Sequence, residues 1–130
     1  MSYSFKKILA LLITKRCVKN FVQGEKPLSD TELGRELDIP MRLMRLILFD
    51  LVEAGILIEI KNDQGQVTYY QPARSVEALT IQYVIERLEK KGDDNIPIKQ
   101  TDDLKDLKQR LEAFHELMAK SRPNAPLKDI

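Results

Sequence analysis

The sequence predicts a mostly α-helical domain with one small β-hairpin, and three observations lead to this fold class. Apolar residues recur with helical spacing over several stretches of the chain. A run of β-branched and apolar residues at 56–60 precedes turn-forming residues at 62–65 and a second β-type run at 67–70. With 130 residues, 43% of them hydrophobic, the chain can bury one core.

Two helices are expected before residue 40. Residues 4–22 carry apolar side chains at helical spacing on one face and basic side chains on the other, and Gly24 follows the last turn. A short second helix starts at Ser29, whose hydroxyl and the Glu32 carboxylate form a capping box. This helix must end before Pro40, because the residue preceding a proline is pushed out of the helical region.

A third helix, a hairpin and a fourth helix follow. Proline suits a first helical turn, so residues 40–54 form the third helix, with Gly55 as its left-handed C-cap. The hairpin covers 56–70 and closes at Pro72, and a fourth helix runs from Thr80 to about residue 91. Two helices joined by a tight corner and followed by a hairpin predict a winged helix-turn-helix domain.

A further helix is expected after a polar linker, over residues 102–121. Its apolar residues are spaced 3, 4, 3 and 4 apart, which is an a/d seam: Leu104, Leu107, Leu111, Phe114 and Met118. Two interpretations stay open, a helix docked on its own domain or a seam for a second chain. The expected division is a basic N-terminal helix (1–23), the winged-helix domain (24–92), the linker (93–101), the heptad-like helix (102–121) and a loose tail (122–130).

Composition and charge limit the classes of function. A single Cys makes no internal disulfide, and the longest early apolar run, residues 8–13, is too short to span a bilayer. A cytoplasmic protein is therefore expected. Net charge is +5 over residues 1–23, −3 over 24–92 and −1 over 93–130. Because phosphate neutralisation supplies most nucleic-acid affinity, an acidic middle segment disfavours strong DNA binding.

The third helix offers a candidate contact surface. With its apolar face buried, seven residues should point outward: Met41, Arg42, Arg45, Leu46, Phe49, Asp50 and Glu53. Three of these are apolar, which favours a protein partner, such as a second copy in a homodimer, over base recognition. The predicted protein-contact residues are Met41, Arg42, Arg45, Leu46 and Phe49, with Leu104, Leu107, Leu111 and Phe114 as a second surface. In the alternative, Arg42, Arg45 and Lys61 contact DNA.

Residues for catalysis or metal binding are sparse. The single histidine, His115, is expected to be a solvated helix residue. Cys17 is expected to be an ordinary thiol, although Arg16 and Lys19 could lower its pKa. The acidic pairs at 93–94 and 102–103 suit a linker and a helix start better than a metal site. We therefore expect no enzyme activity, no catalytic or metal-binding residues and no cofactor.

Several stretches resemble two related groups of winged-helix proteins. These are LSDTELGRELDIP at 28–40, LVEAGIL at 51–57, YQPAR at 70–74 and Leu79–Thr80. One group is the cytoplasmic C-terminal domain of YihY/BrkB inner-membrane proteins, often labelled ribonuclease BN. The other is the IscR type of winged-helix regulator. The first resemblance extends upstream through KRCVKNFVQGEKP at 15–27, and so covers about residues 5–92.

The resemblance to YihY/BrkB proteins implies a non-catalytic interaction or regulatory module. The chain would be a fragment or detached version of a larger protein, on the cytoplasmic side of the inner membrane, with the parent's membrane domain as a partner. The five bases of residues 1–23 suit a segment next to a membrane. The IscR-type resemblance implies the alternative, a DNA-binding transcription regulator. IscR-type sensors carry three clustered cysteines for an iron-sulfur cluster, and no cysteine follows Cys17 here.

Overall fold

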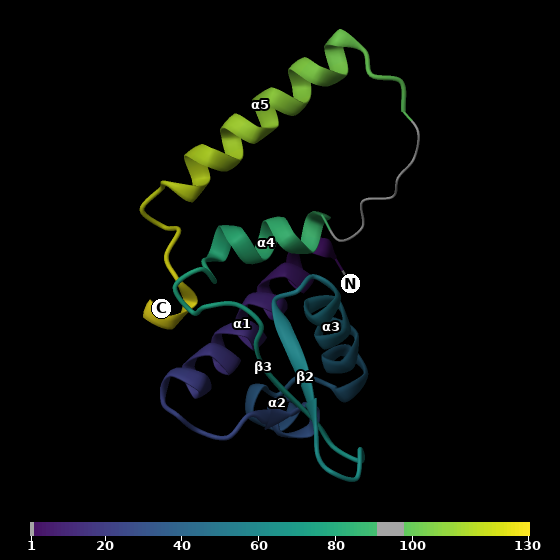
Figure 1. The fold of residues 1–130 in the computed structure, drawn as a ribbon, viewed down its shortest axis with the longest axis vertical. Helices are drawn as coiled ribbons and strands as arrows, with labels where there is room; N and C mark the ends of the chain where they lie inside the picture. The colour runs from purple at the N-terminus through teal and green to yellow at the C-terminus, as the bar shows by residue number, and fades with distance from the viewer. Residues whose placement is uncertain (1, 91–97) are drawn as a thin grey trace.

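The computed structural model describes residues 2–90 and 98–130 (Figure 1). The order of elements is α1 (Tyr3–Val22), β1 (Leu28–Ser29), α2 (Asp30–Leu37), α3 (Met41–Glu53), β2 (Leu57–Lys61), β3 (Thr68–Pro72), α4 (Ile81–Lys90), α5 (Asp102–Ala119) and a final 3₁₀ turn, η1 (Leu127–Asp129). The winged-helix fold class predicted from the sequence is confirmed.

Helix α1 belongs to the same core as the winged-helix elements. Ile13 and Val18 are fully buried and lie in one cluster with Leu51 of α3 and Leu57 of β2. The other side of α1 is less basic than the sequence suggested, because Phe5, Ile8 and Leu12 are largely exposed there. Phe5, Ile8 and Leu12 share the helical spacing of the buried apolar residues of α1. The face of α1 that contacts the core is too narrow to bury them as well.

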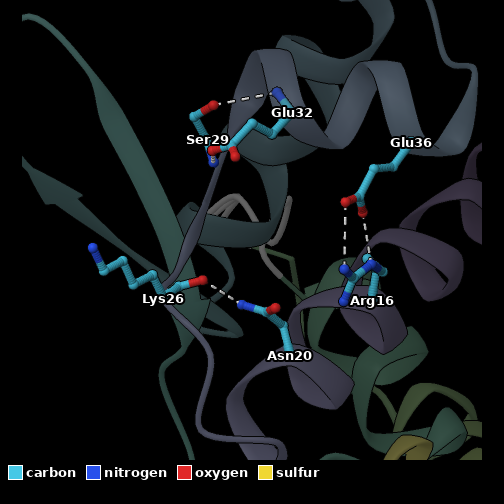
Figure 2. A network of polar contacts seen from close by, with 6 residues as sticks. All are labelled: Arg16, Asn20, Lys26, Ser29, Glu32 and Glu36. Atoms are coloured by element: carbon cyan, nitrogen blue, oxygen red, sulfur yellow. Dashed lines mark hydrogen bonds and ion pairs between the residues drawn. The ribbon is translucent and has the colours of Figure 1, made fainter.

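The corner between α2 and α3 forms as the sequence predicts. The Ser29 hydroxyl accepts from Glu32 N, and the Glu32 carboxylate accepts from Ser29 N, which completes the capping box (Figure 2). Helix α2 ends at Leu37, and its C-cap, Asp38, adopts a left-handed conformation with φ 56°, which aspartate tolerates better than most residues. Pro40 then precedes the first residue of α3.

The sheet has one strand more than predicted. Strands β2 and β3 form the expected antiparallel hairpin, and β1 pairs with the outer edge of β3, with Leu28 opposite Tyr70. A two-residue strand has no periodicity that a sequence pattern can reveal, and its second residue also caps α2. The extra strand supports the wing, since an isolated two-stranded hairpin is only marginally stable.

Polar contacts join α1 to the elements that precede α3. Asn20 Nδ2 donates to Lys26 O over 2.6 Å, which fixes the connector after α1 (Figure 2). Arg16 Nε donates to Glu36 Oε2 over 2.7 Å, which ties α1 to α2. Through these two contacts α1 positions the connector and the helix-turn-helix corner.

The C-terminal residues differ from the expected loose tail. Leu127 is only 3% exposed and its N–H donates to Leu79 O over 2.9 Å. Lys19 of α1 donates to Lys128 O over 2.7 Å. The prolines of residues 122–130 therefore shape an anchored turn, because one apolar side chain among them reaches the core. Helix α5 ends at Ala119 rather than at 121, and most of the predicted linker lies outside the described residues.

Helix α5 diverges from the body of the molecule (Figure 1). Its C-terminal end adjoins α4, whereas its N-terminal end points away. The structure describes every residue of α5, and none of them is buried. The structure thus does not support the interpretation that this helix docks its seam on its own domain.

Candidate nucleic-acid and protein interface

The exposed face of α3 begins with two arginines. Arg42 and Arg45 both lie in the first turns of the helix and are solvent-exposed. Arg45 Nε lies 3.2 Å from Asp30 Oδ2, at the start of α2, and forms an ion pair with it. An exposed ion pair of this kind exchanges readily with other anions, because its net contribution is small. Both guanidinium groups are therefore accessible to a phosphate or a base edge.

Apolar side chains continue the same face. Leu46 is 50% exposed and Phe49 is 59% exposed. A shallow hollow beside them is lined by Pro40, Arg42, Leu43, Arg45 and Leu46. The face therefore combines two cations with an uncovered apolar patch, as the sequence predicted.

Two of the residues predicted to point outward do not do so. Asp50 is buried and forms an ion pair with Lys6 of α1, because α1 packs across the second half of α3. Met41 is partly buried and lies over Gly34 of α2, where a larger residue would collide with its sulfur. The solvent-exposed face of α3 is thus narrower than helical periodicity alone predicted. It centres on four residues: Arg42, Arg45, Leu46 and Phe49.

The wing contributes little positive charge. Lys61 ends β2 and is exposed, as is Asp63 in the turn that follows. Asn62 Oδ1 accepts from the N–H groups of Gln66 and Val67, which closes the turn. Gly65 has a φ of 67°, a conformation that suits glycine. Among the three DNA-contact candidates from the sequence, Lys61 thus lies on the wing and the two arginines lie on α3.

Two carboxylates and Arg45 act on the hydroxyl of Tyr70 in β3. Burial raises the pKa of Tyr70, the negative charges of Glu59 and Asp30 raise it further, and Arg45 lowers it. These shifts report a local field that is negative apart from the arginine. The sequence showed the acidic charge of this segment, but the β1–β3 pairing is what brings Asp30 next to Tyr70.

The seam on α5 forms a second exposed surface. Leu107, Leu111 and Phe114 are each more than half exposed, and Leu104 is partly exposed. Leu117 and Met118 extend the apolar surface toward the end of the helix. A contiguous apolar stripe of this length on a helix is typical of a surface that another chain covers.

Cys17 is the ordinary thiol that the sequence predicted, whereas His115 differs from the expectation of a solvated helix residue. Cys17 is buried, and burial raises its pKa from 9.0 to about 12 although Arg16 acts in the other direction. The raised pKa contradicts the idea that Arg16 and Lys19 make Cys17 a reactive thiol. His115 is not a freely solvated residue, because its Nδ1 atom is buried against α4 and lies 3.6 Å from Glu86 Oε1.

No arrangement typical of a metal site occurs among residues 2–90 and 98–130. No group of three or more His, Cys, Asp or Glu side chains there could hold an ion. Asp102 and Asp103 occupy the first turn of α5, while the pair at 93–94 lies outside the described residues. Within the same ranges, no helix has the length and apolarity needed to cross a membrane.

Known structures resemble this chain over nearly its full length. The CymR protein of B. subtilis, described as its global cysteine regulator, superposes with a TM-score of 0.65 and 19% identity, over 99% of this chain and 95% of that one. CymR of S. aureus gives 0.60 and 17%, over 95% and 93%. IscR of T. potens gives 0.59 and 14%, over 90% and 79%.

These likenesses establish the fold and its similarity to winged-helix regulators of the IscR and CymR type. At this level of identity they carry no residue roles. No protein-family model and no curated protein matches the chain. None of the comparisons supports the resemblance to the YihY/BrkB domain.

Proposed function

We propose that the chain is a DNA-binding winged-helix regulator in which α3 enters the major groove. Arg42 and Arg45 contact bases or phosphates, and Lys61 of the wing contacts the backbone. The observation that carries the proposal is the exposure of both arginines on the first turns of α3, the part of a recognition helix that reaches base edges. The likeness to structures of regulators supports it.

The small number of cations requires two copies. Three cationic contacts per chain supply limited affinity, because each phosphate neutralised adds one increment of counterion release. Helix-turn-helix dimers double these contacts by binding two half-sites. The exposed seam of Leu107, Leu111 and Phe114 on α5 is the surface through which a homodimer would form. We therefore propose that the regulator is a homodimer. We further propose that it is non-catalytic, needs no cofactor and acts in the cytoplasm.

A protein partner on α3 is the second candidate. Leu46 and Phe49 favour it, because an exposed apolar patch is more typical of a protein-binding surface than of a surface that reads bases. This is the interaction module that the resemblance to YihY/BrkB proteins implies. In that case a protein, such as the membrane domain of a parent protein, would cover the two side chains.

Fluorescence anisotropy with labelled mixed-sequence duplex DNA distinguishes the two candidates. Wild-type protein should bind at low salt, and the logarithm of its affinity should fall linearly with the logarithm of salt concentration, by about 0.9 for each phosphate contact. Arg42→Glu combined with Arg45→Glu should abolish binding. The matched control reverses Lys26 and Lys99, which are exposed outside α3, the wing and α5, and changes net charge equally.

The second candidate makes the opposite prediction. If α3 binds protein, wild-type and control variants should both fail to bind duplex DNA. Where the partner on α3 is a second copy, Phe49→Asp should also lower the mass measured by light scattering. Equal loss of DNA binding in the α3 double variant and in the Lys26/Lys99 control would also contradict our proposal, because binding would then depend on net charge and not on α3.

A further inference from the structure

Helix α5 is attached to α4 through a turn at its C-terminal end. The Asn124 side chain accepts from Gln82 N over 2.8 Å, and its amide donates to Ala119 O over 3.0 Å. The Ser121 hydroxyl donates to Met118 O. These contacts join the turn and the last residues of α5 to the start of α4.

A pocket of about 330 Å³ lies where the two helices diverge. Ile81, Ile85 and Glu86 line it from α4, and His115 and Met118 line it from α5. Helix α5 is thus not close-packed on α4 at this point. The angle between the helices consequently depends on the few side chains that bridge the pocket.

His115 faces the Glu86 carboxylate across this space without a hydrogen bond to it. Its Nδ1 atom is buried, has no hydrogen-bond partner among the described residues and lies 3.6 Å from Glu86 Oε1, which is beyond hydrogen-bond distance. Gln82 and Lys90 both donate to the Glu86 carboxylate and hold it in place. A buried acceptor or donor without a partner is unfavourable, so this geometry favours a state in which the two groups pair.

We propose that His115 and Glu86 form a pH-dependent clasp that fixes the angle between α5 and α4. When the imidazole gains a proton, Nδ1 becomes a cationic donor facing a carboxylate, and a short charge-assisted hydrogen bond forms. When it loses that proton, the positive charge that strengthens the bond is lost, the clasp weakens and α5 pivots about the Asn124 turn. Histidine is the side chain whose charge changes between about pH 5 and pH 8.

The neighbouring charges are consistent with this assignment. A hydrogen bond from Lys90 lowers the pKa of Glu86, so its carboxylate is ionised where an imidazole titrates. Glu89 of α4 also lines the pocket and pairs with Lys7 of α1. On α5 itself Lys108, Glu112 and Glu116 flank the histidine and are exposed, as is Arg122 of the turn. Among these groups Glu86 is the one within 4 Å of Nδ1.

The clasp does not depend on DNA binding. If α5 carries the dimer seam, however, its angle sets how far apart two copies of α3 lie, and hence the half-site spacing that a dimer can read. Acidification would then select one spacing. The experiment below measures the angle alone, so its failure would leave the proposed function untouched.

Double electron-electron resonance measures the distance between two spin labels, and this distance changes with the angle between the helices. Labels attached at Glu53→Cys on α3 and Gln109→Cys on α5 occupy exposed positions, and the buried Cys17 stays unlabelled. Labelled protein is mixed with an excess of unlabelled protein to suppress distances between copies. We expect a narrow distance distribution at about pH 5.5 and a broader one at about pH 8.5.

Three variants identify the groups involved. His115→Gln and Glu86→Gln should each give the broad distribution at both pH values. Glu89→Gln, which alters the neighbouring carboxylate, should keep the wild-type response. Circular dichroism confirms that each variant is folded. An unchanged distribution in the wild type, or a pH response that survives in folded His115→Gln, would overturn the clasp.

Discussion

Asp50 lies buried on α3 and forms an ion pair with Lys6 of α1. This contact holds the N-terminal end of α1 against the helix proposed to bind DNA. Lys6→Met should lower the free energy of unfolding by about 1–3 kcal/mol, because the buried carboxylate loses the ion pair with Lys6. Urea unfolding measures the change.

The matched control for Lys6 is an exposed pair. Arg110 and Asp106 are four residues apart on α5 and are both largely solvated. Arg110→Met should change stability by no more than about 0.5 kcal/mol. Similar losses in both variants would show that the burial of Asp50 has no energetic importance.

The ion pair between Asp30 and Arg45 should compete with DNA. Asp30→Asn keeps the shape of the side chain but removes the charge that neutralises Arg45. We expect duplex DNA to bind about two- to fivefold more tightly at low salt, which corresponds to the small net energy of an exposed pair. Anisotropy titration measures this, with Asp106→Asn on α5 as the control for net charge. Weaker binding by Asp30→Asn would contradict the placement of Arg45 at the DNA.

Burial of Cys17 should make stability depend on alkaline pH. Its folded pKa of about 12 exceeds its ordinary value of 9.0, so between these values the unfolded chain releases the thiol proton and the folded chain keeps it. The free energy of unfolding should therefore fall as pH rises through this range. The fall should be smaller in Cys17→Ala, compared by urea unfolding. Identical pH profiles would show that the thiol ionises equally in both states.

Leu127 should anchor the end of the chain. Its side chain lies in the core beside the α1 contacts, so Leu127→Ala should cost about 2–4 kcal/mol of stability. Ile130, three residues later, is 47% exposed, and Ile130→Ala is the matched control, with an expected cost of less than about 1 kcal/mol. Thermal unfolding of both variants measures the difference. A loose tail would make the two variants equally stable.

The α5 seam should mediate self-association. Leu111→Asp places a charge in the middle of the apolar stripe and should convert a dimer to a monomer in sedimentation equilibrium. Ala113→Asp places the same charge on another face of the helix, where it is exposed, and should leave the mass unchanged. Dimers in both variants would assign self-association to another surface, such as the exposed residues of α1.

The sequence by itself determined the local structure of this protein. The capping box at Ser29, the proline at 40 and the left-handed glycine at 55, which follows the C-cap Ala54, each act through neighbouring backbone groups, so their positions specify where α2 and α3 begin and end. The exposure of Arg42, Arg45, Leu46 and Phe49 followed from helical periodicity alone. The hairpin followed in the same way from its β-branched runs and its turn.

Tertiary structure decided the features that depend on contacts between distant segments. Strand β1, the burial of Asp50, the anchoring of Leu127 and the position of His115 against Glu86 each need a partner far away in the sequence. Periodicity identifies an apolar face but does not state what covers it. The divergence of α5 is the clearest case, because the same seam fits its own domain or a second copy, and only the packed structure shows that its own domain leaves it exposed.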